Sequence, residues 1–323
     1  MTIADVKSDI QQKDKPIGRF ESRTWSRIRR DWQLYLLLAL PLAWLLLFQY
    51  YPMYGAQIAF RDYKPGLGIT ESPWVGLKNF EQFFHSYLFS RVILNTLWLS
   101  FYSLAVGFPL PILFALAITQ LTGGLYKRSI QMVSYAPNFI STVVMVGIIL
   151  QFLDIRTGPI NILLKALGLD TINFIGLADW FPSIYVWSGA WQFTGFSAII
   201  YIAVLSTVDP TLHEAAVMDG ANRLQRIWYV DIPALLPTAM TLLILNMGQI
   251  LNVGFEKTFL MQNTLNQSAS EVISTYVYKV SLAAGIASYS YGAAIGLFNS
   301  IIGFILLFLA NQISKRLTGN SLW

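Results

Sequence analysis

The chain has 323 residues, of which 55% are hydrophobic and 12% charged, with a net charge of +5. Soluble domains carry about 25% charged residues, so this composition excludes an ordinary soluble protein and indicates an integral membrane protein. The chain has no cysteine, which excludes a disulfide framework, thiolate metal sites and cysteine nucleophiles.

Residues 1–32 are predicted to form a basic cytoplasmic tail. The first 30 residues hold eight lysines and arginines, and no apolar run begins before Leu34, too late for a cleaved signal peptide. Residues 1–15 read as a solvated tail. The alternating basic and aromatic residues of 19–32 indicate a helix on anionic lipid headgroups.

Six apolar segments follow, each long enough for a membrane-spanning helix, which needs about 20 apolar residues. They cover residues 33–51, 91–119, 130–153, 182–208, 233–254 and 289–312. The predicted fold class is therefore an all-α integral membrane protein. Its transmembrane domain covers 33–313, and residues 314–323 form a C-terminal tail.

The lysines and arginines predict the orientation of these spans. With the N-terminus inside, the inner segments hold 14 of the 22 lysines and arginines. The positive-inside rule then predicts that both termini are cytoplasmic. The outer segments are 52–90, 154–181 and 255–288, with helices expected at 161–169 and 271–282.

The spans contain almost no ionisable residue away from their ends. Carriers coupled to protons or sodium usually hold such groups at mid-membrane, so the sequence disfavours an ion-coupled mechanism. His85 and His213 lie outside the spans, where they cannot serve a buried proton relay. No GxxxxGK[ST] phosphate loop is present, so the chain is not expected to bind ATP through one.

Uncharged polar and aromatic residues within the spans are candidates for a solute path. Asn246, Gln249 and Asn252 repeat every three residues and share one helical face. Amides bind hydroxyl groups, and aromatic rings pack on sugars, so such a path suits a bulky polyhydroxylated solute. The alternative is that these amides join helices through hydrogen bonds. The other path candidates are Trp187, Trp191, Gln192 and Asn299 in the spans, and Tyr278 and Lys279 in the outer segment 255–288.

An acidic solute would need a cation near this path. Lys279 is the first candidate and Lys257 the second, although either residue is more commonly a solvated surface lysine. The sequence leaves a neutral solute open.

The segment Asp209–Pro233, between the fourth and fifth spans, is too polar to cross a bilayer. Asp209 is a helix cap, and Pro210 takes the first helical position, where its missing N–H costs nothing. Gly220 after Asp219 ends this helix, since glycine accepts the left-handed conformation. A second amphipathic helix then leads to Pro233, which opens the fifth span. We therefore predict two short helices along the membrane surface, forming a knob that docks another chain.

The sequence EAAVMDGA at 214–221, followed by Ile232-Pro233, closely resembles the coupling loop of ABC-importer membrane subunits, EAAxxDGA…IxLP. Ile232 stands where that pattern has leucine, a mild departure. The resemblance implies the type I importer permease fold and a loop that contacts a partner ATPase. The coupling residues that it implies are Glu214, Ala215, Ala216, Asp219, Gly220 and Ala221.

The resemblance covers most of the chain and extends to carbohydrate permeases related to the maltose system. Residues 51–84, 252–261 and 271–280 are similar to the subgroup that imports oligosaccharides derived from polysaccharides, alginate among them. In that family a sugar-contacting asparagine matches Asn252, whereas Val253 replaces a second asparagine.

This resemblance also implies the protein's surroundings. It places the chain in a bacterial inner membrane with a homologous second permease, two ATPase subunits and an external solute-binding protein. It implies that the chain is not an enzyme and holds no cofactor, because ATP and Mg²⁺ bind to the ATPase.

Two rival functions come from other classes. A secondary carrier or channel for sugars would need no docking loop, and usually has charges in its spans. A membrane-embedded glycan enzyme would need paired carboxylates or a metal cluster, and the outer acids Asp62, Glu71 and Glu81 show no such motif.

Overall fold

The computed structural model describes residues 30–121, 123–283 and 288–318, so most of the predicted basic tail lies outside the described residues. The chain divides into two compact units, and the boundary in the sequence lies between Gln57 and Ile58. In the first unit one helical segment passes through α3 (Trp32–Leu45), a π-helical turn and α4 (Tyr51–Met53). None of the residues of α3 is buried, although the helix is apolar all round, which fits a helix that meets lipid or another chain.

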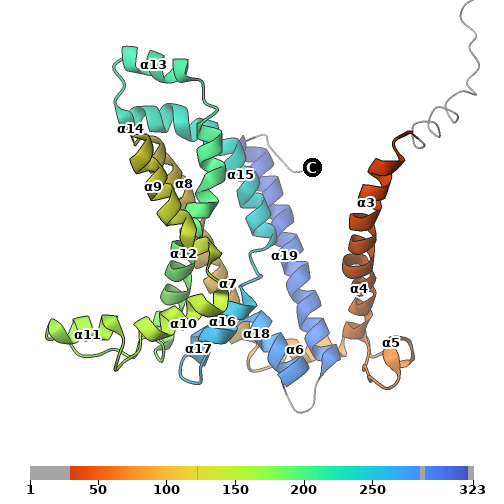
Figure 1. The fold of residues 1–323 in the computed structure, drawn as a ribbon. Helices are drawn as coiled ribbons and strands as arrows, with labels where there is room; N and C mark the ends of the chain where they lie inside the picture. The colour runs from red at the N-terminus through yellow and green to blue at the C-terminus, as the bar shows by residue number, and fades with distance from the viewer. Residues whose placement is uncertain (1–29, 122, 284–287, 319–323) are drawn as a thin grey trace, which may run out of the picture. The chain divides into compact units, whose positions relative to one another are not determined.

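The second unit forms no β-strand among its described residues. Its long helices are α7 (Phe89–Gly107), α8 (Pro109–Thr119), α12 (Phe181–Leu205), α15 (Ile232–Gly248) and α19 (Tyr289–Thr318). Helix α12 packs against α7, α8 and α15, and α15 also packs against α19 (Figure 1). These helices build a bundle around α12.

Five helical segments in the described parts of the chain are long and apolar enough to span a membrane. They are Trp32–Phe60, Phe89–Thr119, Ala178–Leu205, Arg223–Gly248 and Tyr289–Arg316. Each corresponds to one of the six apolar segments expected from the sequence. The predicted all-α membrane fold is thereby confirmed.

The remaining predicted span, 130–153, is not one straight helix. Helices α9 (Gly124–Tyr135) and α10 (Thr142–Phe152) are separated by a 3₁₀ turn (Ala136–Phe139), and the two halves are bent by 100°. Pro137 lies in this turn and cannot donate a backbone hydrogen bond. Ser141 then caps α10, because its hydroxyl accepts a hydrogen bond from the Val144 N–H.

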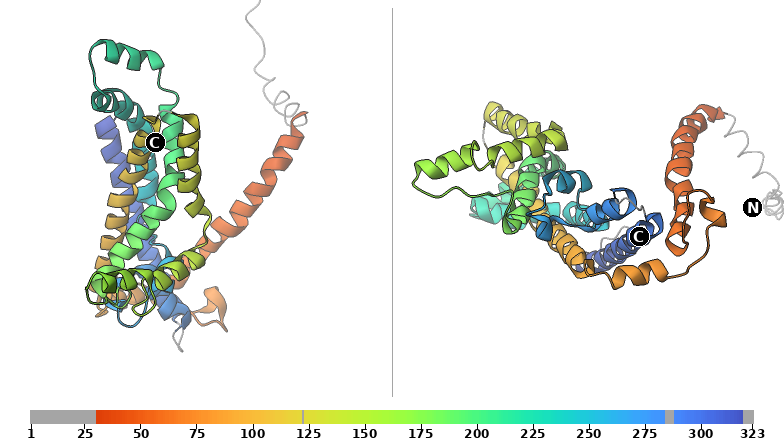
Figure 2. Two further views of the ribbon diagram at one scale, coloured as in Figure 1. Left: turned by 60° about the vertical axis from the view of Figure 1, so that its left-hand side comes forward. Right: turned by 90° about the horizontal axis from the view of Figure 1, so that it is seen from below.

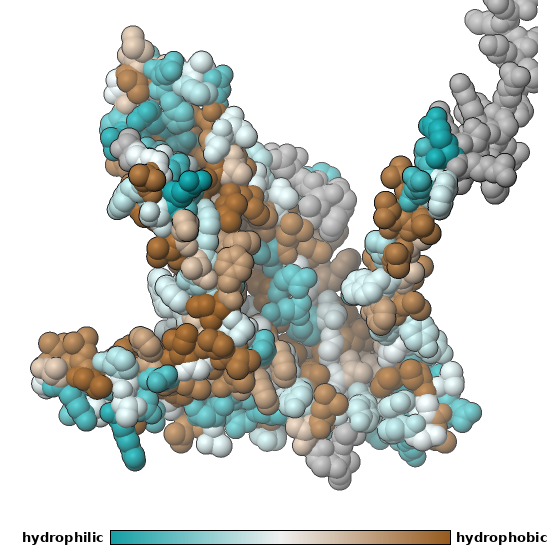
Figure 3. Space-filling model, viewed as in Figure 1, coloured by the Kyte–Doolittle hydropathy of each residue, from teal (hydrophilic) through white to brown (hydrophobic). Residues whose placement is uncertain are grey.

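The short helices gather at the two opposite ends of the bundle (Figures 1 and 2). Helices α13 (Pro210–Met218) and α14 (Arg223–Arg226) lie at one end. At the other end lie α6 (Lys78–Phe84), α10, α11 (Pro159–Ala166), α16 (Phe255–Met261), α17 (Gln267–Ser270) and α18 (Ile273–Tyr278). Helix α5 (Gly68–Glu71) precedes α6 in the chain. Figure 3 shows hydrophilic residues over α13 and α14, and hydrophobic residues along α10 and α11.

Two helix boundaries near the predicted site differ from the sequence expectation. Helix α14 passes through a π-helical turn (Ile227–Asp231) into α15, so Pro233 lies inside a continuous helical segment that begins at Arg223. The π-helical turn lies just before Pro233, and such a turn changes the register of backbone hydrogen bonds where the proline N–H is missing. Helix α15 ends at Gly248 rather than at residue 254, so Gln249 and Asn252 lie in the following irregular segment.

Candidate functional site

A cavity of about 760 Å³ lies within the bundle, which we call the main cavity. Its walls come from α7, α8, α12, α15 and the irregular segment after α15. The polar residues on these walls are Ser100, Ser103, Tyr185, Ser197, Tyr201, Asn246, Gln249 and Asn252. The cavity falls within the range of ligand pockets, about 300–1,000 Å³, and offers hydroxyl and amide groups without a charge.

The three predicted amides all line this cavity. Asn246 lies in the last turn of α15, and the end of the helix at Gly248 lets the chain turn so that Gln249 and Asn252 follow it. The Asn252 amide donates to the Gln249 side-chain oxygen over 2.7 Å, which orients both groups. Val253, the position at which the resemblance implies a second asparagine, also lines the cavity. The contact of the three amides with a solute remains a prediction.

The other predicted path residues do not gather with these amides. Trp187 and Trp191 line a separate hollow of about 410 Å³, and the Trp187 indole donates to the Tyr102 hydroxyl over 3.0 Å. Gln192 is buried, and its amide donates to the Ile140 carbonyl over 2.8 Å, at the bend between α9 and α10. The Gln192 contact joins helices, which is the alternative role that the sequence left open for such amides.

Tyr278, Lys279 and Asn299 also lie apart from the amides. The Tyr278 ring packs against Phe255 and Phe259, with ring centroids 5.3 and 5.1 Å apart. Asn299 lies on α19, and its buried side-chain oxygen has no hydrogen-bond partner among the described residues. These positions give the three residues no shared surface on the main cavity.

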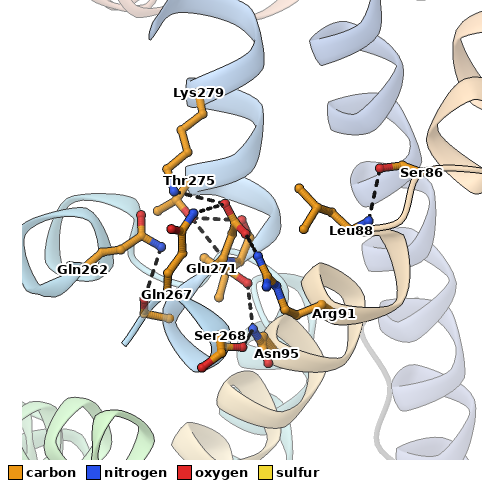
Figure 4. A network of polar contacts seen from close by, with 12 residues as sticks. Ser86, Leu88, Arg91, Asn95, Gln262, Gln267, Ser268, Glu271, Thr275 and Lys279 are labelled. Carbon is orange, nitrogen blue, oxygen red and sulfur yellow. Dashed lines mark hydrogen bonds and ion pairs between the residues drawn. The ribbon is translucent and has the colours of Figure 1, made fainter. Parts of the chain in front are cut away.

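Lys279 belongs to a network centred on Glu271 (Figure 4). The Glu271 carboxylate is buried and accepts from Arg91 over 2.6 Å, from Lys279 over 3.0 Å and from Gln267 over 3.0 Å. Burial alone raises the pKa of Glu271, but these three donors outweigh it and hold the pKa below its usual value. Lys279 is therefore paired with a carboxylate of the same chain, a contact that the sequence spacing did not indicate.

Lys257 is instead buried in α16 beside α12, only 8% exposed. Its ammonium donates to the Tyr185 carbonyl over 2.8 Å and lies 4.7 Å from the centre of the Tyr185 ring. Burial lowers the pKa of Lys257 to about 8. This is the reverse of the order that the sequence suggested, in which Lys279 was the first candidate cation and Lys257 the second.

The segment 209–233 forms the second part of the site, at the opposite end of the bundle from α16 (Figure 1). The predicted first helix is present as α13, and the Asp209 carboxylate caps it by accepting from the Thr211 N–H over 2.9 Å. Hydrogen bonds from Thr211 also lower the pKa of Asp209. Gly220 has φ +80°, the left-handed conformation predicted for the helix stop.

The predicted coupling residues occupy the exposed part of this segment. Glu214, Ala215, Asp219 and Gly220 are exposed, and Ala216 and Ala221 are half-buried. Several large hydrophobic side chains of the same segment are also exposed: Leu212, Val217, Met218, Leu224, Trp228 and Tyr229. Large apolar side chains on a polar loop are typical of a surface that another protein covers.

Asp231 was not singled out in the sequence, yet it connects this segment to the bundle. Its buried carboxylate lies 3.4 Å from the His213 imidazole of α13 and accepts from Gln120, just after α8, over 3.4 Å. Asp231 itself directly precedes α15. One acidic side chain at the start of the fifth span thus contacts the exposed loop and the end of the second span.

A helical membrane bundle with a ligand-sized cavity that carries amide and hydroxyl groups, and with an exposed docking loop at one end, defines a transport permease. The chain belongs to the family of binding-protein-dependent transport system inner membrane components, which matches residues 107–319. This match includes the loop and most of the residues that line the main cavity. The resemblance inferred from Glu214–Pro233 is thereby confirmed, and the chain is a permease subunit of the ABC-importer class.

Relatives over nearly the whole chain support this assignment. Protein LplB of Bacillus subtilis is 43% identical over 289 residues, 90% of each chain. The polygalacturonan/rhamnogalacturonan transport system permease protein YteP of the same organism is 41% identical over 283 residues, 88% of each chain.

Solved structures show the same fold. A chain of a bacterial ABC transporter involved in import of the acidic polysaccharide alginate is 38% identical, with a TM-score of 0.84 over 92% of this chain and 99% of that one. The alginate transporter in complex with an alginate pentasaccharide-bound periplasmic protein has a TM-score of 0.85 at 38% identity, over 93% of this chain and 100% of that one.

Proposed function

We propose that this permease carries oligosaccharides derived from polysaccharides, in an importer driven by ATP. The observation that carries the proposal is the cluster of Asn246, Gln249 and Asn252 on a cavity of about 760 Å³. Amides and hydroxyls exchange hydrogen bonds with sugar hydroxyls at a smaller desolvation cost than charges would pay. The named cargoes of relatives, polygalacturonan/rhamnogalacturonan and alginate, support the same class of solute.

The energy source in this proposal is a partner ATPase. Two ATPase subunits bind ATP and Mg²⁺, and the loop around Glu214–Gly220 docks on one of them from the cytoplasm. A homologous second permease completes the pathway, and both termini of this chain are cytoplasmic. The chain itself performs no catalysis. Exposed apolar residues such as Met218 and Trp228 on the loop support such a docked partner.

A solute-binding protein delivers the cargo at the opposite end of the bundle, on segments 52–90 and 255–288. The neighbouring alginate transporter is known in complex with such a periplasmic protein, which supports this role. Closing the ATPase dimer moves α13, and Asp231 passes the motion to α15 through its contact with His213. The main cavity then changes the side to which it opens, as a two-state element biased from both ends.

Reconstitution tests the proposal directly. The permease is purified with its ATPases and second permease, placed in proteoliposomes and supplied with its solute-binding protein and a panel of labelled oligosaccharides. We expect uptake only when ATP is present on the ATPase side. Uptake without ATPase subunits, driven by a proton or sodium gradient, would instead establish the rival secondary carrier.

A further inference from the structure

Lys257 is a buried cation without an acidic partner in the part of the chain that the structure describes. The ion pairs among the described residues join Arg30 to Asp31, Arg91 and Lys279 to Glu271, and His213 to Asp231. Lys257 takes part in none of them, and the hydrogen bond that it forms among these residues goes to the neutral Tyr185 carbonyl. Burying an unpaired charge is costly, so a lysine kept in this position calls for a functional reason.

The cation faces a second hollow, which we call the side pocket, of about 220 Å³. Lys257 lines this pocket together with the hydroxyl-bearing residues Ser103, Thr194 and Ser197. Gly189, on α12, lies against the ammonium: a Cβ at this position would be 3.3 Å from the Lys257 nitrogen. The glycine thus keeps the pocket wall open beside the charge.

The side pocket adjoins the main cavity. Both are lined by Ser103, Gly107, Pro111, Tyr185 and Ser197. The Tyr185 hydroxyl accepts from the Gly254 N–H over 3.1 Å, while the Tyr185 carbonyl accepts from Lys257, so this residue contacts groups that line both spaces. A group that branches from a solute in the main cavity therefore has a positively charged, hydroxyl-lined recess next to it.

An anionic group is the ligand that this recess fits. An ammonium carries three donors, and only one is used by the Tyr185 carbonyl. A carboxylate would accept from the remaining donors and from the serine and threonine hydroxyls, and its charge would offset the burial of the lysine. The lowered pKa of Lys257, about 8, is consistent with a site that is desolvated and still lacks its counter-charge.

We propose that the side pocket is a carboxylate subsite, in which Lys257 binds the carboxylate of an acidic sugar. The hydroxyls of the same sugar then bind Asn246, Gln249 and Asn252 in the main cavity. This inference rests on the proposed transport of oligosaccharides and adds that the cargo is built from uronic acids. Lys257 then determines specificity between acidic and neutral oligosaccharides.

The test uses the complete importer in proteoliposomes with its solute-binding protein, and tetragalacturonate as the probe. We expect Lys257→Met to lower ATP-dependent uptake at least tenfold, since a charged hydrogen bond is worth about 1.5–3 kcal/mol and 1.4 kcal/mol is tenfold. The control is Lys165→Met, which removes an exposed lysine from α11 and should leave uptake at the wild-type level. Co-purification of each variant with its partners reports on assembly.

The absence of cysteine from the chain allows the charge to be restored chemically. In a Lys257→Cys variant, aminoethyl methanethiosulfonate adds an ammonium, and the propyl reagent adds a neutral group of similar length. Only the aminoethyl adduct should recover tetragalacturonate uptake, with the wild-type importer treated in parallel to account for cysteines in partner chains. Equal recovery with both reagents, or recovery with neither after labelling is verified, would overturn the carboxylate subsite, because each shows that charge at this position does not read the cargo. A thiol that neither reagent labels would overturn it as well, because a pocket that receives a solute carboxylate must also admit a reagent of that size.

The wild-type importer separates this inference from the proposed function. Uptake of methyl-esterified tetragalacturonate without uptake of the acid would contradict the carboxylate subsite and leave an oligosaccharide importer standing. ATP-dependent uptake of no oligosaccharide in the panel would contradict the proposed function itself.

Discussion

The Glu271 network predicts a measurable loss of stability when its charge is removed. Glu271→Gln keeps the size of the side chain but takes the negative charge away from Arg91 and Lys279. Breaking a fully buried ion pair costs about 3–5 kcal/mol. The Glu271 side chain is 2% exposed, but those of Arg91 and Lys279 are 39% and 32% exposed, so water screens the two cations and offsets part of this cost. We therefore expect a loss of about 2 kcal/mol.

Thermal unfolding of the importer in nanodiscs measures this loss. About 2 kcal/mol corresponds to a decrease of about 4 °C in Tm for a chain of this size. The matched control is Glu81→Gln, which removes an exposed carboxylate from α6 and should change Tm by less than about 1 °C. Equal Tm values for the two variants would refute the view that the network holds α7, α17 and α18 together.

The same carboxylate predicts a dependence on pH. Its pKa is lower in the folded protein than in the unfolded chain, so the stability that it contributes is present at neutral pH and is lost as the pH falls through the folded pKa. The difference in Tm between wild type and Glu271→Gln should therefore shrink in acid. A difference that stays constant from neutral pH to strong acid would contradict the ion-pair account.

Two further predictions concern packing and burial. Folding lowers the pKa of Lys257 from 10.5 to about 8, so the unfolded chain binds more protons than the folded protein between these pH values. The stability of the wild type should therefore rise with pH across that window. Lys257→Met should abolish this rise and be about 3 kcal/mol more stable than the wild type below pH 8. Unfolding scans of both proteins at several pH values check this, and parallel curves would contradict it. Gly195→Ala on α12 should cost about 1–3 kcal/mol, because the added Cβ would collide with the backbone of Ser134. Gly296→Ala on α19 is its control, with open space around the new Cβ and an expected effect near zero in the same scans.

Local signals in the sequence were sufficient for the loop and for most of the spans. Asp209 caps α13 and Gly220 ends it as predicted, because capping and left-handed glycine depend on neighbouring backbone groups alone. The apolar segments likewise identify spans because a bilayer imposes a length and a composition. The bend at Pro137 could have been expected from the proline, but the 100° angle depends on packing against α12.

The roles of single polar residues could not be read in the same way. Gln192 and Trp187 have the residue types of a sugar path, yet their partners are Ile140 and Tyr102 on other elements. The same holds for the two lysines: among the described residues Lys279 pairs with Glu271 and Lys257 forms no ion pair, and neither fact follows from their positions in the sequence. Contacts between segments distant in the chain leave no periodic trace in a single sequence.

We propose that segment 209–233 couples this permease to a partner ATPase, and the ATPase activity of the reconstituted importer reports on this coupling. The combined substitution of Glu214→Ala and Gly220→Val changes two exposed positions, and the second introduces a β-branched residue where φ is +80°. The assay is the ATPase activity of the reconstituted importer that is stimulated by cargo-loaded binding protein, measured together with uptake. We expect both the stimulated ATPase activity and the uptake to fall to background. Stimulated ATPase activity and uptake equal to those of the wild type would contradict this coupling.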